Sequence, residues 1–162
     1  MLARADAGAL ALQREPIELG DLAQSAAELI RPAAAQRGRG VKVEGEAAIT
    51  VVADQDLLLQ LLLNLADNAV KYTDTGEITL GWRPEPPPSL FVRDTGPGIA
   101  AAHQERVFER FYRVDTARSR QGGGVGLGLA IARLIAEAPG GSIGLESDAG
   151  GSTFTVRLPQ PG

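Results

Sequence analysis

DQDLLLQLLLNLADNAVKY, residues 54–72, decides the fold because it predicts one long, mostly apolar helix that carries a polar stripe. Asp54 is a suitable N-cap for this helix. Asn64, Asn68, Lys71 and Tyr72 follow at positions i, i+4, i+7 and i+8, so they share one helix face. Asn is a poor residue for a helix interior, because its amide competes for backbone hydrogen bonds. Two Asn on one face therefore call for an explanation.

Two interpretations of this face stay open on the helix alone. The stripe is either a solvated surface or a site where Asn amide oxygens hold Mg²⁺, which prefers hard oxygen ligands and bridges phosphates. Lys71 would then supply a point charge to the phosphates, and it is one of only two Lys in the chain.

A second signal is the stretch Asp94-Thr95-Gly96-Pro97-Gly98, which follows an expected strand. Gly96 and Gly98 let the backbone approach a ligand closely, and the Asp94 carboxylate can accept a hydrogen bond from an amino group such as adenine N6. Ile99 can add apolar packing. An ordinary Asp in a tight loop is the alternative. The dinucleotide fingerprint is rejected, because Pro97 sits in the turn and no later strand delivers an acid for a ribose.

The third signal is a glycine-rich run immediately before another expected helix, over residues 126–138. The order of the three signals is more specific than any one of them. Free backbone N–H groups and the helix dipole at such a place accept anionic phosphates, although Gly can also simply form a hinge. A P-loop is excluded, because the chain contains no G-x-x-x-x-G-K-[ST] sequence. The residues of this run that we expect at the phosphates are Gly124, Val125, Gly126, Leu127, Gly128 and Leu129.

The rest of the pattern predicts an α/β fold in which helices cover a mixed sheet. Residues 1–15 resemble the end of a helix, closed by Pro16, and residues 95–124 form a long connection that is typical of a functional lid or a disordered segment. The other expected elements are a helix over residues 21–36 with Asp21 as its cap and with its end at 38–40, and strands at 17–19, 41–44, 49–52, 76–82, 89–93, 142–147 and 152–158.

Composition limits the class of protein. The 162 residues with 44% hydrophobic content suit one domain, and the net charge of −4 with scattered Arg argues against a nucleic-acid partner. The chain has no Cys, so disulfide and thiolate chemistry are excluded. Its longest apolar run is well below the roughly 18 residues of a membrane span, and no export signal is visible. We expect a cytoplasmic domain without direct membrane contact.

With these motifs assembled, the chain resembles the catalytic ATP-binding domain of sensor histidine kinases, in the superfamily shared with gyrase and ATPase chaperones. Residues 64–72 resemble its N box, 94–99 its first G box, 108–111 its F box and 124–129 its second G box. The resemblance implies a two-layer α/β sandwich of the Bergerat type with an ATP lid. It also implies that residues 16–162 are the catalytic domain, preceded by the end of the dimerisation and histidine-phosphotransfer domain in residues 1–15.

The resemblance implies roles for individual residues. Asn68 would bind Mg²⁺, Asn64 and Lys71 would face the phosphates with Tyr72 near them, and Asp94 would hold adenine, supported by Thr153. The lid would be set by Phe108, Arg110 and Phe111, and its Arg113, Arg118 and Arg120 would approach the γ-phosphate. Hydrolytic relatives carry Glu four residues before the metal-binding Asn, whereas Asn64 cannot take a proton at neutral pH. The substitution favours phosphoryl transfer over hydrolysis; a gyrase- or chaperone-like ATPase and a non-catalytic ATP sensor are the alternatives.

The phosphoacceptor is expected outside this chain. The only His, His103, falls in the expected lid without the acidic neighbour of a phosphoacceptor site, and we interpret it as a surface residue. The implied partners are ATP, a His-bearing dimerisation domain of the same kinase and a downstream response regulator. The resemblance further implies a monomeric fragment of a homodimeric parent, and leaves open whether that parent is anchored in the inner membrane.

Overall fold

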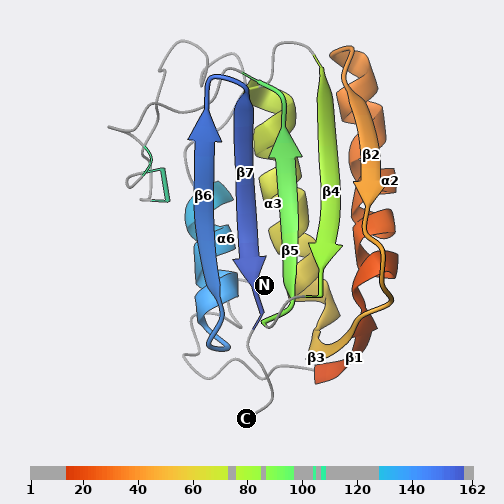
Figure 1. The fold of residues 1–162 in the computed structure, drawn as a ribbon, viewed down its shortest axis with the longest axis vertical. Helices are drawn as coiled ribbons and strands as arrows, with labels where there is room; N and C mark the ends of the chain where they lie inside the picture. Colours follow the sequence, from red (N-terminus) through yellow and green to blue (C-terminus); the bar gives the residue numbers. More distant parts are fainter. Residues whose placement is uncertain are drawn as a thin grey trace.

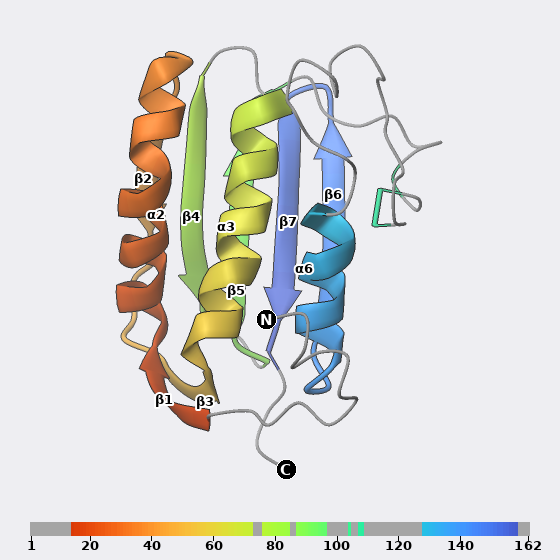
Figure 2. The same cartoon turned by 180° about the vertical axis from the view of Figure 1, so that it is seen from behind.

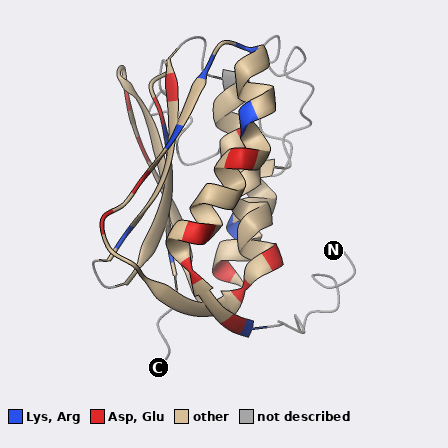
Figure 3. Ribbon diagram, turned by 90° about the vertical axis from the view of Figure 1, so that its right-hand side faces the viewer, with Lys and Arg blue, Asp and Glu red and all other residues tan. Residues whose placement is uncertain are grey.

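The computed structural model describes residues 14–72, 76–84, 87–96, 104, 107–108 and 128–158. A sheet and a layer of helices form two layers, seen edge-on in Figure 3. Along the chain the elements are β1 (Arg14–Glu18), α2 (Leu19–Gln36), β2 (Gly40–Glu44), β3 (Thr50–Asp54), α3 (Gln55–Tyr72), β4 (Glu77–Arg83), β5 (Ser89–Asp94), α6 (Gly128–Glu137), β6 (Ser142–Asp148) and β7 (Gly151–Arg157).

The main sheet has five strands in the order β2-β4-β5-β7-β6 (Figure 1). β2 runs parallel to β4, and all other neighbours are antiparallel. β1 and β3 form a separate two-stranded antiparallel sheet at one end. The mixed sheet covered by helices on one face, expected from the sequence, is confirmed. Among the described residues, no helix is both long enough and apolar enough to span a bilayer.

The core lies between the sheet and the three helices α2, α3 and α6, which lie side by side over one face of the sheet (Figure 2). Because side chains alternate along a strand, every second residue of each strand points into this core. Leu80 of β4, Val92 of β5 and Val156 of β7 are almost completely buried there. α3 contributes Leu61, Leu62 and Leu65, which are fully buried. Its hydrophobic side thus fixes the direction in which its polar stripe points.

Two helix ends form as the sequence predicts. Asp54 caps α3, since its Oδ1 accepts a hydrogen bond from the Leu57 amide at 3.1 Å. α2 ends in a Schellman motif: the Gly38 amide donates to the Ala35 carbonyl at 3.0 Å and the Arg39 amide to the Ala34 carbonyl at 2.9 Å. Gly38 adopts φ of +73°, which suits glycine at this position.

The N-terminal expectations need correction. α2 begins at Leu19 and is capped by Glu18, whose carboxylate accepts from the Gly20 and Asp21 amides, so Asp21 is not the cap. The nearby Glu18 charge raises the pKa of Asp21. Arg14 and Glu15 belong to β1 rather than to a helix. The domain boundary expected after residue 15 stays a prediction. The preceding residues 1–13 lie outside the described residues.

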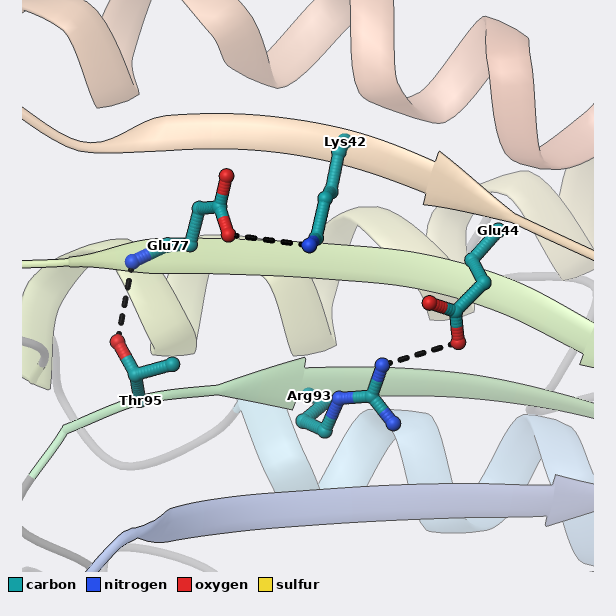
Figure 4. A network of polar contacts seen from close by, with 5 residues as sticks. All are labelled: Lys42, Glu44, Glu77, Arg93 and Thr95. Atoms are coloured by element: carbon teal, nitrogen blue, oxygen red, sulfur yellow. Dashed lines mark hydrogen bonds and ion pairs between the residues drawn. The ribbon is translucent and has the colours of Figure 1, made fainter.

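The other face of the sheet is polar, and none of the described helices lies on it (Figures 3 and 4). Lys42 Nζ lies 3.2 Å from Glu77 Oε1, and Arg93 reaches from β5 to Glu44 of β2 at 3.0 Å. Partly exposed pairs of this kind contribute at most about 1 kcal/mol each.

An aromatic side chain is also buried on this face. Phe91, 2% exposed, packs over Gly81, where an added Cβ would lie 2.4 Å from the ring. The Arg83 and Arg93 guanidinium carbons lie 4.3 and 5.2 Å from its centroid. Gly81 pairs with Phe91 across β4 and β5, and the absence of a side chain at Gly81 leaves the space that the Phe91 ring fills.

Candidate functional site

The described parts of the three motifs converge at one end of the main sheet. α3 and β5 both end there, β6 ends there and β7 begins there (Figures 1 and 2). α6 runs opposite to α3, so the N-terminus of α6 points toward the same end (Figure 2). Segments that are far apart in sequence are thus brought together. The convergence is the geometry that a composite site requires.

On α3, Asn64, Asn68 and Lys71 lie in the last two turns or just before them, as the spacing predicts, and all three side chains are half-buried. Asn64 Nδ2 is buried and has no hydrogen-bond partner among the described residues. A buried amide nitrogen without an acceptor costs about 1–3 kcal/mol, so native proteins rarely leave one. Asn64 is therefore suited to donate to an acceptor oxygen supplied by a ligand.

Lys71 is ion-paired within α3. Its Nζ lies 3.0 Å from Asp67 Oδ2, one turn earlier, and the Lys71 side chain is 24% exposed while that of Asp67 is 50% exposed. The pair holds the ammonium beside the Asn face and neutralises it. Asp67 is not among the residues predicted from the sequence, although its i, i+4 spacing to Lys71 is a usable signal.

Asp94 ends β5 and shapes the turn that follows it. Its Oδ1 accepts a hydrogen bond from the Gly96 amide at 2.9 Å, which is the local Asx-type geometry that favours Asp before a turn. Thr95 extends the ladder to β4, since its amide donates to the Glu77 carbonyl at 3.3 Å and its Oγ1 accepts from the Glu77 amide at 3.0 Å (Figure 4). Backbone and side chain together hold Asp94 in place.

Two glycines, Gly76 and Gly151, pack closely against Asp94 and Thr95. Gly76 has φ of +107°, and a Cβ there would lie 2.1 Å from Thr95 Oγ1. Gly151 has φ of +141°, and its Cβ would lie 2.0 Å from the Asp94 carbonyl oxygen. Both the backbone conformation and the space exclude a side chain at these positions. The Asp94 backbone is thus held closely between the starts of β4 and β7.

The strand register decides which β7 residue lies beside Asp94. Asp94 pairs with Ser152, whereas Thr153 pairs with Arg93. Because side chains alternate, Ser152 shares the helix-covered face with Asp94, and Thr153 lies on the open face. The register therefore places Ser152, which is 5% exposed, beside Asp94, and Thr153 beside Arg93.

Phe108, from the expected F box, packs edge-on against Phe154 of β7 with ring centroids 5.7 Å apart. Val107 beside it is 5% exposed and belongs to the core. Gln104 Nε2 donates to the Ser147 carbonyl on β6 at 3.4 Å. These contacts tie part of the segment between the two glycine-rich motifs to the strands β6 and β7.

Gly128 and Leu129 form the first turn of α6, and of the second glycine-rich run only these two residues are described. The side chain of Tyr72 is not described. The other expected site residues lie outside the described residues; they are Gly98, Ile99, Arg110, Phe111, Arg113, Arg118, Arg120, Gly124, Val125, Gly126 and Leu127. Their assignments stay predictions.

Comparison with known proteins matches this geometry to one family. Residues 53–162 match the family model described as histidine kinase-, DNA gyrase B-, and HSP90-like ATPase. The signal transduction histidine-protein kinase BaeS of Escherichia coli K12 is 40% identical over 162 residues, which is 98% of this chain and 34% of BaeS. The chain thus spans about a third of the length of this curated relative.

Solved structures give the same result. Full-length ShkA in complex with AMPPNP superimposes with a TM-score of 0.84 at 35% identity, over 98% of this chain and 34% of ShkA. The catalytic domain of the histidine kinase ThkA superimposes with a TM-score of 0.77 at 26% identity, over 92% of this chain and 97% of that domain. The chain therefore belongs to the histidine kinase-, DNA gyrase B- and HSP90-like ATPase family, as an ATP-binding domain of the sensor histidine kinase type.

Proposed function

We propose that this chain is the catalytic domain of a sensor histidine kinase, which binds Mg-ATP and presents its γ-phosphate to a His on a separate helical domain. The observation that carries the proposal is the convergence of the Asn face of α3 with Asp94 at one end of the sheet. A site of this composition offers amide oxygens, a cation and a carboxylate to one ligand. The similar ShkA structure is a complex with AMPPNP, which supports the same class of ligand here.

Asn64 fits the phosphate end of such a ligand. Its buried Nδ2 lacks an acceptor among the described residues, and a phosphate oxygen would satisfy it. Lys71 lies on the same face and can exchange its contact with Asp67 for a phosphate. Arg113 and Arg118 of the expected lid would add positive charge; they are part of the proposal on resemblance alone.

The same face fits a magnesium ion. An amide oxygen is the hard ligand that Mg²⁺ accepts, and Mg²⁺ is commonly held by one or two protein ligands together with phosphates and waters. Asn68 is the residue we assign to it. When bound, the ion would neutralise phosphate charge.

Asp94 and Ser152 fit the base. Asp94 is held in position by the Gly96 amide, by the hydrogen bond between Thr95 and Glu77, and by the close packing of Gly151. Its carboxylate is an acceptor for the exocyclic amino group of adenine. Ser152 lies in register with Asp94 on the same face of the sheet, so we assign to Ser152 the supporting role that the resemblance gave to Thr153.

Asn64 also bears on the reaction type. An amide cannot remove a proton from water, so the domain lacks a general base at this position. Phosphoryl transfer instead needs positioning and charge neutralisation, with the nucleophile supplied by the His of the helical domain. A response regulator would receive the phosphoryl group next, and a homodimeric parent would bring the two domains together.

The test of this function is phosphotransfer. The chain is mixed with its His-bearing helical domain, ATP and Mg²⁺, and acid-labile phosphohistidine is measured. We expect transfer with the wild-type chain, loss of transfer with Asn68→Ala and little phosphate release by the chain alone. Steady phosphate release without transfer would instead favour a gyrase- or chaperone-like ATPase. Tight ATP binding with neither transfer nor release would favour a nucleotide-sensing module.

A further inference from the structure

Two arginines on the helix-free face of the main sheet have no acidic partner among the described residues. This face is turned to the viewer in Figure 1, with the helices behind it. Arg83 of β4 and Arg157 of β7 are exposed, and each pairs with Ser89 of β5 in the strand register. Because Ser89 lies two residues before Phe91, all three share the face of Phe91, at the end of the sheet opposite to Asp94. No ion pair between described residues includes either arginine.

The other two described cations of this face are neutralised. Lys42 Nζ lies 3.2 Å from Glu77 Oε1, and Arg93 Nη2 lies 3.0 Å from Glu44 Oε2. The chain as a whole is acidic, with a net charge of −4, so carboxylates are not scarce. The two remaining arginines thus form a local positive region on an acidic protein.

The Arg83 guanidinium lies over the sheet and beside a second cation. Its Cζ is 4.3 Å from the centroid of the Phe91 ring, and that ring fills the space over Gly81. The Arg93 guanidinium lies 5.2 Å from the same centroid. Two cations therefore share one ring, but only Arg93 has a carboxylate. An anion supplied by a partner would relieve this imbalance.

The Arg157 guanidinium lies on the other side of the same row of residues. Its Nη1 would be 3.7 Å from a Cβ at Gly144, so it reaches the neighbouring strand β6. Gly81 and Gly144 are three strand spacings apart, roughly 14 Å, with Thr155 of β7 in the row between them. One carboxylate or phosphate cannot bridge this distance by hydrogen bonds of about 2.7 to 2.9 Å. Two carboxylates at positions i and i+4 of an extended peptide, roughly 13 Å apart, match it.

We infer that Arg83 and Arg157 form a docking surface for an acidic segment of a partner protein, with the Thr155 hydroxyl as a hydrogen-bonding group between them. Two cations are too few to hold a nucleic-acid backbone against the net charge of the chain. The surface lies on the opposite face of the sheet from the helices and roughly 17 Å along β5 from Asp94. Docking there needs neither the nucleotide nor the phosphotransfer of the proposed function.

The test uses a fluorescently labelled peptide of alternating Glu and Gly, titrated with the chain at low salt and followed by fluorescence anisotropy. We expect saturable binding, weakened about five- to twentyfold in Arg83→Gln/Arg157→Gln, because two exposed charge pairs are lost. Arg83→Lys/Arg157→Lys keeps both charges and should retain most of the affinity. A peptide of alternating Gln and Gly should not bind, and saturating Mg-ATP should leave the dissociation constant of the Glu peptide unchanged.

Arg31→Gln/Arg37→Gln is the matched control, because it removes the same charge from two exposed side chains in and just after α2. Its dissociation constant for the Glu peptide should equal that of the wild type. Equal losses in both Gln double variants would overturn the inference, since the attraction would then depend on net charge alone. Absence of binding by the wild type would overturn it too, as would displacement of the peptide by Mg-ATP. Tighter binding of a single-stranded oligonucleotide than of the peptide would replace it with a nucleic-acid site.

Discussion

Asp94→Asn is expected to lower the affinity for Mg-ATP about ten- to a hundredfold while the domain stays folded. The Asn side chain keeps an oxygen that can accept from the Gly96 amide, so the turn survives. The exchange removes the negative charge and replaces the second acceptor with an NH₂ donor, which faces the donor hydrogens of adenine N6. A charge-assisted hydrogen bond of this kind is worth roughly 1.5 to 3 kcal/mol. Calorimetric titration measures the change.

Asp148→Asn is a control with the same local geometry. Asp148 Oδ1 accepts from the amide of Gly150 two residues later at 2.7 Å, as Asp94 Oδ1 does from Gly96 at 2.9 Å. Asp148 is exposed on the β6–β7 turn, and its exchange should leave nucleotide affinity unchanged. A wild-type dissociation constant in Asp94→Asn would exclude the assigned contact with the base.

Gly151→Ala is expected to destabilise the domain by about 2 to 5 kcal/mol, which combines backbone strain with overpacking. At φ of +141° an L side chain is strained, and its Cβ would lie 2.0 Å from the Asp94 carbonyl oxygen. Because Asp94 must shift to make room, nucleotide affinity should fall as well. The loss is a large part of the roughly 5 to 15 kcal/mol that typically stabilises a domain. Urea unfolding followed by the fluorescence of Trp82, the only Trp, measures it.

Gly38→Ala separates strain from crowding. Gly38 also has positive φ, +73°, but no atom lies within 4 Å of an added Cβ. Its exchange should cost only about 1 kcal/mol and leave nucleotide affinity unchanged. Equal destabilisation by the two variants, or unaltered nucleotide binding in Gly151→Ala, would contradict the tight packing of Gly151 against Asp94.

Features set by neighbouring residues were predictable from the sequence. The cap at Asp54, the helix end at Gly38 and the shared face of Asn64, Asn68 and Lys71 each depend on contacts within one or two turns. Hydrophobic periodicity likewise predicts the strands of the main sheet within about two residues of their observed ends. The N-terminus shows the limit of such signals: Glu is an uncommon N-cap, so the sequence favours Asp21 over Glu18.

Features that depend on pairing between distant strands were not predictable. A shift of one residue in register moves a side chain to the other face of a sheet, so the sequence alone does not say whether Ser152 or Thr153 shares a face with Asp94. Arg14 and Glu15 were expected at the end of a helix that Pro16 closes, whereas they belong to β1, where Pro16 pairs with Val52 in a two-stranded sheet.

The central claim is that one nucleotide occupies the site between the Asn face of α3 and Asp94, and calorimetric titration of the folded chain with ATP and Mg²⁺ tests it most directly. We predict saturable heat with one nucleotide per chain, weakened in Asp94→Asn and unaffected in Asp148→Asn. Absence of heat at millimolar nucleotide, from a sample whose circular dichroism shows the folded domain, would contradict the claim.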